Sequence, residues 1–137
     1  MSRRYNRRMA APRPPLGGLS PRIFLRDYWQ KRPLLVRQAI PDFAGVVKKS
    51  TLFALAADDE AESRLIEKAP DWRVTHGPLA RRVLSRLPRT GWTLLVNGVN
   101  LHSPEADTLL KRFAFASWAR LDDVMVSYAA DGGGVGG

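Results

Sequence analysis

Hydrophobic residues in the first third of the chain follow a helical spacing and then a short strand-like run. Ser20-Pro21 can begin a helix, because the Ser hydroxyl can accept a free backbone N–H and Pro at the first position loses no hydrogen bond. The apolar stripe of this helix is formed by Ile23, Phe24 and Tyr28. Pro33 ends the helix, and Leu34-Leu35-Val36 is predicted to form a short strand.

The middle of the chain predicts a second helix and a hairpin. Ser50 or Thr51 can cap this helix, whose apolar positions are Leu52, Phe53 and Leu55. Arg64-Leu65-Ile66 and Trp72-Arg73-Val74-Thr75 indicate two paired strands around a turn at Ala69-Pro70-Asp71.

The second half predicts two further helices around a buried strand. Leu79, Val83, Leu84 and Leu87 recur at helical spacing, and Pro88 closes that segment. Trp92 to Val96 is a continuous apolar run, which favours a strand buried on both faces. Pro104 begins the last predicted helix, with Leu109, Leu110 and Phe113 facing inward.

The final segment predicts a strand that runs into a turn. Val124, Val126 and Tyr128 alternate with other residues, as in a half-buried strand, and Asp131-Gly132 is a strong turn signal. Short strands mixed with amphipathic helices indicate an α+β fold with the helices outside the sheet.

Composition limits the class of protein. Of the 137 residues 45% are hydrophobic, which is enough for one modest core, and there is no cysteine for a disulfide or a thiolate metal site. A reducing cytoplasm is therefore compatible with the chain. No apolar run approaches the roughly 20 residues that cross a bilayer, so we expect no membrane segment.

The net charge of +9 is concentrated at the start of the chain. Five arginines precede Leu16 without any acid: Arg3, Arg4, Arg7, Arg8 and Arg13. We interpret residues 1–18 as a basic, Arg- and Pro-rich disordered tail and linker, and residues 19–137 as the folded part. The tail could contact RNA weakly through phosphates. The alternatives are a solubilising extension, a start at Met9 instead of Met1, or a transit peptide.

The polar motifs carry little sign of chemistry. Neither His76 nor His102 has a carboxylate two residues later. Glu105 follows His102 by three residues, but the intervening Ser103-Pro104 favours a helix cap over a metal site. His76, next to Gly77-Pro78, is interpreted as a turn residue.

Three other patterns have plain interpretations. The cluster of Asp58, Asp59, Glu60 and Glu62 is interpreted as solvated surface. Gly132-x-Gly134-x-x-Gly137 has the spacing of a dinucleotide fingerprint, but no helix or later acid follows it, so we predict a glycine turn that allows close backbone approach. The tryptophans are assigned to core packing: Trp29, Trp72, Trp92 and Trp118.

The C-terminal residues resemble one protein family. Asp122-Asp123-Val124-Met125-Val126-Ser127-Tyr128, followed by Gly132-Gly133-Gly134-Val135-Gly136, resembles the entry to the active site of the bacterial ribosomal oxygenases. These belong to the JmjC, or cupin-like, Fe(II)- and 2-oxoglutarate-dependent dioxygenases. Segments 19–37, 72–78, 92–100 and 118–123 are also similar to the family, so the resemblance runs roughly from Leu16 onwards.

The resemblance implies a cofactor set that this chain does not complete. In the family the glycine segment continues with Pro and a His-x-Asp motif that supplies two iron ligands, and a later His supplies the third. Here the Pro position is Gly137, and none of the three ligands is present. We therefore expect Fe(II) and 2-oxoglutarate in the intact enzyme, but neither bound tightly by this chain, to which no catalytic or metal-ligating residue is assigned. The candidates for lining the pocket are Ser127, Tyr128, Gly133, Gly134 and Gly136.

The implied fold consists of the N-terminal helices and first strands of a double-stranded β-helix, which is a jelly-roll barrel, left incomplete and with exposed sheet edges. The implied activity of the intact enzyme is 3-hydroxylation of an arginine in a ribosomal protein of the large subunit, the sixteenth of the L series, in the cytoplasm. We expect this chain alone to be inactive. The alternative hypothesis is a non-catalytic basic module that binds RNA or a ribosomal protein, and a frameshift or premature stop in the gene is a third.

Overall fold

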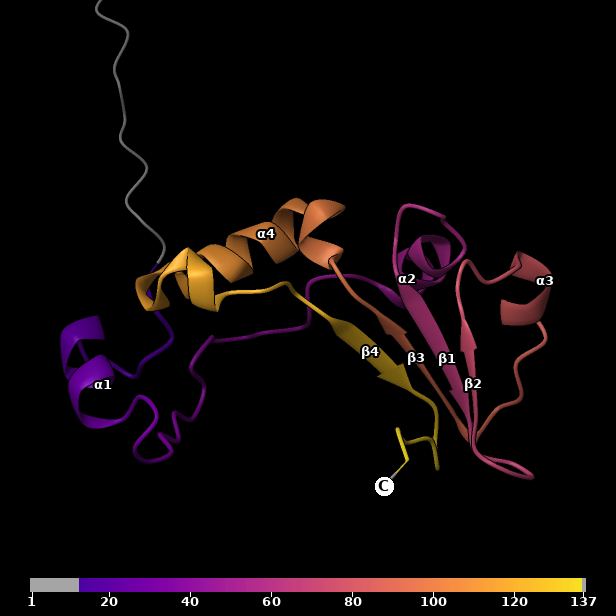
Figure 1. The fold of residues 1–137 in the computed structure, drawn as a ribbon, viewed down its shortest axis with the longest axis horizontal. Helices are drawn as coiled ribbons and strands as arrows, with labels where there is room; N and C mark the ends of the chain where they lie inside the picture. Colours follow the sequence, from indigo (N-terminus) through magenta and orange to yellow (C-terminus); the bar gives the residue numbers. More distant parts are fainter. Residues whose placement is uncertain (1–12, 137) are drawn as a thin grey trace, which may run out of the picture.

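An open four-stranded antiparallel sheet forms the centre of the computed structural model, which describes residues 13–136 (Figure 1). The strands lie in the order β2-β1-β3-β4 and span Ser63–Glu67 (β1), Arg73–His76 (β2), Trp92–Val96 (β3) and Val126–Ala129 (β4). Each strand runs antiparallel to its neighbours. β2 and β4 are therefore the edges of a sheet that does not close. The predicted α+β class, with an incomplete barrel, is confirmed.

Four short α-helices accompany the sheet: α1 (Pro21–Asp27), α2 (Lys49–Ala56), α3 (Arg81–Leu84) and α4 (Pro104–Lys111). Three single 3-10 turns follow β3: η1 (Val99–Leu101), η2 (Ala114–Ala116) and η3 (Trp118–Arg120). The predicted caps of α1 and α4 are confirmed, because the hydroxyls of Ser20 and Ser103 each accept a backbone N–H at 3.3 Å. Between residues 13 and 136, no helix has the length and apolar character needed to span a membrane.

The core lies between one face of the sheet and the helices. Leu65, Leu94 and Val96 point to this face, and they pack with residues of α2, α3, η1 and α4. The helix residues of this cluster are Leu52, Ala56, Leu84, Val99 and Ala106. We call this side the helix-covered face. Because side chains alternate along a strand, Ile66, Thr93 and Leu95 lie on the opposite face.

The opposite face is buried around β3 as well. All five residues of β3 are buried, which confirms the prediction of a strand covered on both sides. The hairpin prediction is also correct, since β1 pairs with β2 from Arg64 opposite His76 to Glu67 opposite Arg73. β2 is exposed along its whole length, so it is an uncovered edge.

Residues 34–36 do not form the predicted strand. They lie in an irregular segment, and no backbone hydrogen bond joins residues 33–47 to any other part of the chain that the structure describes. A strand needs a partner for its N–H and C=O groups, and none lies alongside here. Leu35 is 77% exposed as a result.

Two helices differ from the prediction at their ends. α2 begins earlier than predicted, with Lys48 as its N-cap residue and no side-chain cap, so neither Ser50 nor Thr51 caps it. α3 is a single turn, in which Leu84 is buried and Val83 is 40% exposed. The core assignment of the tryptophans is correct for Trp92 and wrong for Trp72 and Trp118, which are 49% and 58% exposed.

The proposed tail and linker lie partly outside the described residues, because residues 1–12 are not described. In the part that is described, residues 13–18 are not helical, and Leu16 is 5% exposed. Gly17 packs against Val36, because a Cβ at this glycine would lie 3.0 Å from the Val36 side chain. The division at residue 18 stays a prediction.

Candidate functional site

The end of β4 positions the glycine segment, residues 132–136. β4 pairs with β3 so that Leu95 faces Ser127 and Leu94 faces Tyr128. After the strand, the Ala130 N–H donates to the Trp92 carbonyl at 3.0 Å, and the Gly91 N–H donates to the Asp131 carbonyl at 2.8 Å. The turn predicted at Asp131-Gly132 is present, with Gly132 at a φ of +67°.

Gly133 lies directly against the backbone of β3. A Cβ at this position would overlap the Trp92 carbonyl oxygen and would lie 2.8 Å from the Ala130 oxygen. It would also lie 3.0 Å from the Thr93 hydroxyl, on the opposite face of the sheet. Only glycine allows this approach. The next glycine, Gly134, lies beside the exposed Trp72 ring.

Ser127 and Tyr128 point to different sides of the sheet. Ser127 is exposed on the opposite face, together with Ala129. Tyr128 is half-buried on the helix-covered face, where its ring stacks on Trp92 with 5.5 Å between centroids. Tyr128 there lines a cavity of about 670 Å³ with Phe53, Arg89 and Asp131. The two residues therefore border different spaces, and their pocket-lining roles stay predictions, as do those of the glycines.

A cation also lines the cavity beside Tyr128, and the sequence analysis does not predict it. The Lys49 ammonium lies 4.6, 5.3 and 5.6 Å from the ring centres of Tyr128, Phe53 and Trp92. A lysine in the first turn of a helix that has no acid there was the available signal, because the helix dipole disfavours a cation at this end.

The opposite face holds two buried polar atoms without a hydrogen-bond partner among the described residues. They are Nε of Arg64 and Oγ1 of Thr93, in the adjacent strands β1 and β3. Thr93 is 2% exposed. Unpaired buried polar groups cost free energy and are uncommon in native proteins. The sequence analysis missed them, because it treats the segment from Trp92 to Val96 as one apolar run and does not single out Thr93.

The two histidines lie in different segments of the fold. His76 ends β2 and is exposed, and His102 follows η1 and is exposed. His102 borders an acidic cavity of about 300 Å³, which is also lined by Glu60, Glu62, Asp122 and Asp123. Glu105 instead accepts the Ser103 hydroxyl at 2.9 Å. Its own backbone N–H and then this hydroxyl hold the pKa of Glu105 below its ordinary value. Within residues 13–136, no three or more of these side chains are placed so that they could hold a metal ion together.

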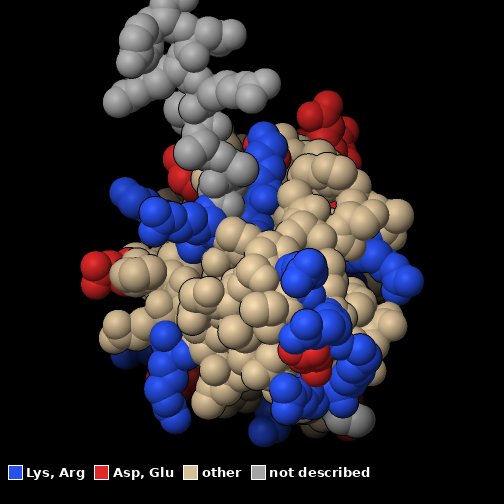
Figure 2. Space-filling view, turned by 90° about the vertical axis from the view of Figure 1, so that its left-hand side faces the viewer, with Lys and Arg blue, Asp and Glu red and all other residues tan. Residues whose placement is uncertain are grey.

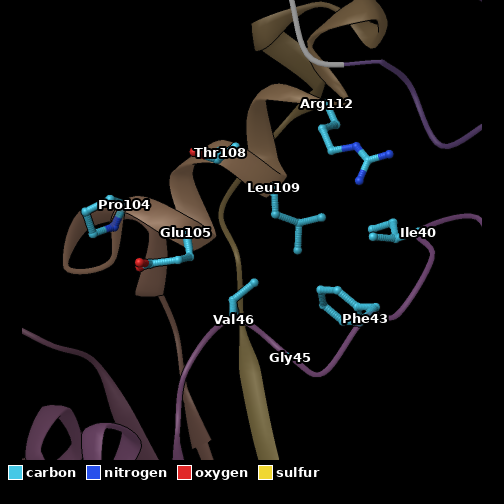
Figure 3. A pocket seen from close by; sticks show the side chains of 9 residues that line it. All are labelled: Ile40, Phe43, Gly45, Val46, Pro104, Glu105, Thr108, Leu109 and Arg112. Carbon is cyan, nitrogen blue, oxygen red and sulfur yellow. The ribbon is translucent and has the colours of Figure 1, made fainter.

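A further groove, which is apolar, lies away from the sheet end. It has a volume of about 370 Å³ and lies between α4 and residues 40–46 (Figure 3). Ile40, Phe43 and Val46 line one side, and Leu109 of α4 faces them. Glu105 and Arg112 also belong to its lining. No motif in the sequence indicated it.

Known proteins share the sequence pattern of this chain. The chain matches no protein-family model. It is 38% identical over 120 residues to a probable ribosomal oxygenase of Haemophilus influenzae, and 36% identical over 115 residues to the ribosomal protein uL16 3-hydroxylase of Escherichia coli K12. These matches cover 86% and 82% of the chain, but 30% of each relative.

Solved structures give the same result. YcfD, a ribosomal oxygenase from Escherichia coli, superposes with a TM-score of 0.76 at 34% identity, covering 87% of this chain and 33% of YcfD. The same protein is known in complex with cobalt and 2-oxoglutarate, again with a TM-score of 0.76. The fold and the sequence therefore place this chain with the JmjC-type oxygenases, and within them it belongs with the bacterial ribosomal oxygenases. It spans about a third of their length. The sequence identity and the superposition confirm the family resemblance.

Proposed function

We propose that the chain is the N-terminal part of an Fe(II)- and 2-oxoglutarate-dependent ribosomal oxygenase, of the type that 3-hydroxylates an arginine of a large-subunit ribosomal protein. The supporting observation is the shared identity of 36% with the uL16 3-hydroxylase across 115 residues. The non-catalytic basic module is the less favoured alternative, because both curated relatives are named as oxygenases or hydroxylases.

The residues described here supply the sheet rather than the metal site. Iron in this enzyme class needs two histidines and a carboxylate on one side of the metal. His76 ends β2 and His102 follows η1, and between residues 13 and 136 no group of three His, Asp or Glu side chains is placed so that it could hold a metal ion. The described side chains therefore do not fit the metal, and no step of oxygen activation is assigned to them.

The proposed role of the chain is to fix the approach to that site. Gly133 packs on the Trp92 carbonyl, which holds the glycine segment against the end of β3. We propose that Ser127, on the opposite face of the sheet, lines the cosubstrate or substrate pocket together with Gly133, Gly134 and Gly136. Tyr128 contributes from the helix-covered face through its contact with Trp92.

A ribosomal protein is the proposed partner, since one relative is named for uL16. Cytoplasmic location follows from that partner. The Arg-rich start of the chain supports weak, salt-dependent RNA contact, because arginines release counterions from phosphates. Deletion of residues 1–15, which removes all five arginines, should abolish this contact.

The proposal is tested with a chimera in which this chain replaces the matching third of YcfD. Mass spectrometry of a uL16 peptide after incubation with Fe(II), 2-oxoglutarate and O2 should detect the addition of one oxygen atom. The chain alone should give no succinate above background. A chimera that folds but is inactive would contradict the proposal, and so would succinate formation by the chain alone that is coupled to peptide hydroxylation.

A further inference from the structure

The chain just before β4 is bound by the turn that follows β3. The Asn100 side-chain oxygen accepts the Val124 N–H at 2.8 Å, and the Asp123 carboxylate accepts the Gly98 N–H. Between these two contacts, the Val99 N–H donates to the Val124 carbonyl at 3.0 Å. We call these three hydrogen bonds the β4 clamp.

The β4 clamp lies in a partly buried place. Asn100, Asp123 and Val124 are all half-buried, so water competes less for their polar groups than it would at the surface. A hydrogen bond to a carboxylate is also stronger than one between neutral groups. The clamp is therefore a specific contact between two segments that are more than 20 residues apart in the sequence.

The apolar pattern of β4 does not fix its register by itself. Val124, Val126, Tyr128 and Ala130 pack against the core, which is every second residue. A shift of one residue would turn these side chains to the other face and is excluded. A shift of two residues, however, puts another apolar residue in the place of Val126 and of Tyr128. The observed register, in which Leu94 faces Tyr128, therefore needs a further determinant.

The clamp supplies that determinant before the strand, and the glycine segment supplies one after it. A shift of two residues would bring Leu121 or Met125 to the place of Asp123, and neither side chain has a carboxylate. At the other end, the same shift would bring a residue with a side chain to the place of Gly133, where only glycine fits. β4 is therefore held at both ends.

The register of β4 decides where the residues after it lie. A shift of two residues moves each β4 side chain by roughly 7 Å along the sheet. Tyr128 would then leave the Trp92 ring on which it stacks, and Gly133 would leave the Trp92 carbonyl. The position of the glycine segment thus depends on the bonds that Asn100 and Asp123 make at the start of the strand.

The clamp is complete within the described residues, unlike the surface around α1. Figure 2 shows that side of the molecule as a broad uncharged area bordered by lysines and arginines. Because the chain spans about a third of the length of its relatives, the remainder of such a protein is the first candidate to cover this area. The two acceptors of the clamp, in contrast, already bind their donors.

We propose that Asn100 and Asp123 are positioning residues for the pocket of the enzyme, because they hold β4 in register and thereby place the glycine segment. Both act through β4 and not by contact with a ligand. This proposal rests on the proposed function, in which the glycine segment lines the cosubstrate or substrate pocket.

Nuclear magnetic resonance of the whole chain tests whether the clamp sets the register. Nuclear Overhauser contacts should join the backbone protons of the facing residues Leu94 and Tyr128 in the native chain. Asp123→Ala should weaken these contacts, and it should speed amide hydrogen exchange in β4 by about tenfold, as expected for the loss of one hydrogen bond to a charged group.

Matched variants separate the hydrogen bond from the charge. Asp123→Asn keeps an oxygen acceptor for the Gly98 N–H and should preserve the register. Asp122→Ala is the control, because it removes the same charge from the neighbouring, exposed residue. Asn100→Ala removes the other side-chain acceptor and should act in the same direction as Asp123→Ala. If Asp123→Ala does not fold, Asn100→Ala decides the test.

The chimera with YcfD separates positioning from stability. Asp123→Ala and Asn100→Ala should each raise the KM for 2-oxoglutarate or for the uL16 peptide by about tenfold, because the glycine segment is displaced. A loss of stability alone would reduce the amount of active enzyme, which lowers the apparent kcat and leaves KM unchanged. Ser20→Ala, which removes the cap of α1, is the control for stability and should leave both KM values unchanged.

Two results would overturn the proposal. The first is unchanged exchange and unchanged Overhauser contacts of β4 in both Asp123→Ala and Asn100→Ala. The second is a chimera in which these substitutions lower kcat alone, since the clamp would then serve stability only. A chimera that is inactive without either substitution contradicts the proposed function instead, and the measurements on the chain still decide whether the clamp sets the register.

Discussion

The Lys49 ammonium lies 4.6 Å from the centre of the Tyr128 ring, and this contact joins the start of α2 to the end of β4. Phe53 and Trp92 complete a group of three rings around the cation. α2 has no acid in its first turn, so the helix dipole alone would disfavour Lys49 at that place. The rings offset this cost through cation–π attraction.

A double-mutant cycle with Lys49→Ala and Tyr128→Leu should therefore give a coupling free energy of about 0.5–1 kcal/mol. Lys49→Ala removes the unfavourable interaction with the helix dipole whether residue 128 is Tyr or Leu, so this effect cancels in the cycle. Urea unfolding followed by tryptophan fluorescence measures the free energies. Lys48→Ala with Tyr128→Leu is the matched control, and equal coupling in both cycles would show that the contact with the ring has no special role.

The glycine segment gives a second test. Gly133→Ala should lower the free energy of unfolding by about 1–3 kcal/mol, because the added methyl group overlaps the Trp92 carbonyl. Gly134→Ala should have a much smaller effect, since its Cβ would meet the Trp72 ring at 3.4 Å, an ordinary contact distance. Thermal unfolding of the two variants compares them directly, and indistinguishable melting temperatures would rule out the close packing of Gly133.

The sequence predicted those elements whose signals are local. Pro21 and Pro104 follow serines that cap helices, so both starts were visible. The β3 run is apolar apart from Thr93, and both of its faces are buried. The Asp131-Gly132 pair is a local turn signal, and in the structure Gly132 has the positive φ that glycine adopts readily.

The remaining differences depend on what lies alongside each segment. Leu34 to Val36 has the composition of a strand, but pairing requires a neighbour that composition does not reveal. Trp72 is exposed because β2 is an edge, a fact that the order of the strands decides. The segment from Leu79 to Leu87 has a helical spacing, yet α3 starts at Arg81 without a side-chain cap or an acid in its first turn.

The unpaired hydroxyl of Thr93 gives a third prediction. Thr93→Val keeps the shape of the side chain and removes a buried group that has no partner within residues 13–136. We expect it to raise the free energy of unfolding by about 1 kcal/mol. Thr108→Val, at an exposed position of α4, should change it by less than about 0.5 kcal/mol. A loss of stability in Thr93→Val would mean that the hydroxyl is hydrogen-bonded in solution.

The cap of α4 links stability to pH. The Glu105 backbone N–H and the Ser103 hydroxyl lower the pKa of Glu105, so its folded carboxyl binds protons more weakly than the unfolded one. This contribution is present above the unfolded pKa and is lost as the pH falls through the folded pKa. Ser103→Ala should cost about 1 kcal/mol at neutral pH, and it should lose less stability than the native chain between neutral pH and about pH 3. Urea midpoints at the two pH values measure this difference.

Ser20→Ala is the control, because α1 has a serine cap but no acid in its first turn. This variant should lower the urea midpoint without changing its pH dependence. An unchanged pH dependence in Ser103→Ala would refute the link between the serine and the carboxylate.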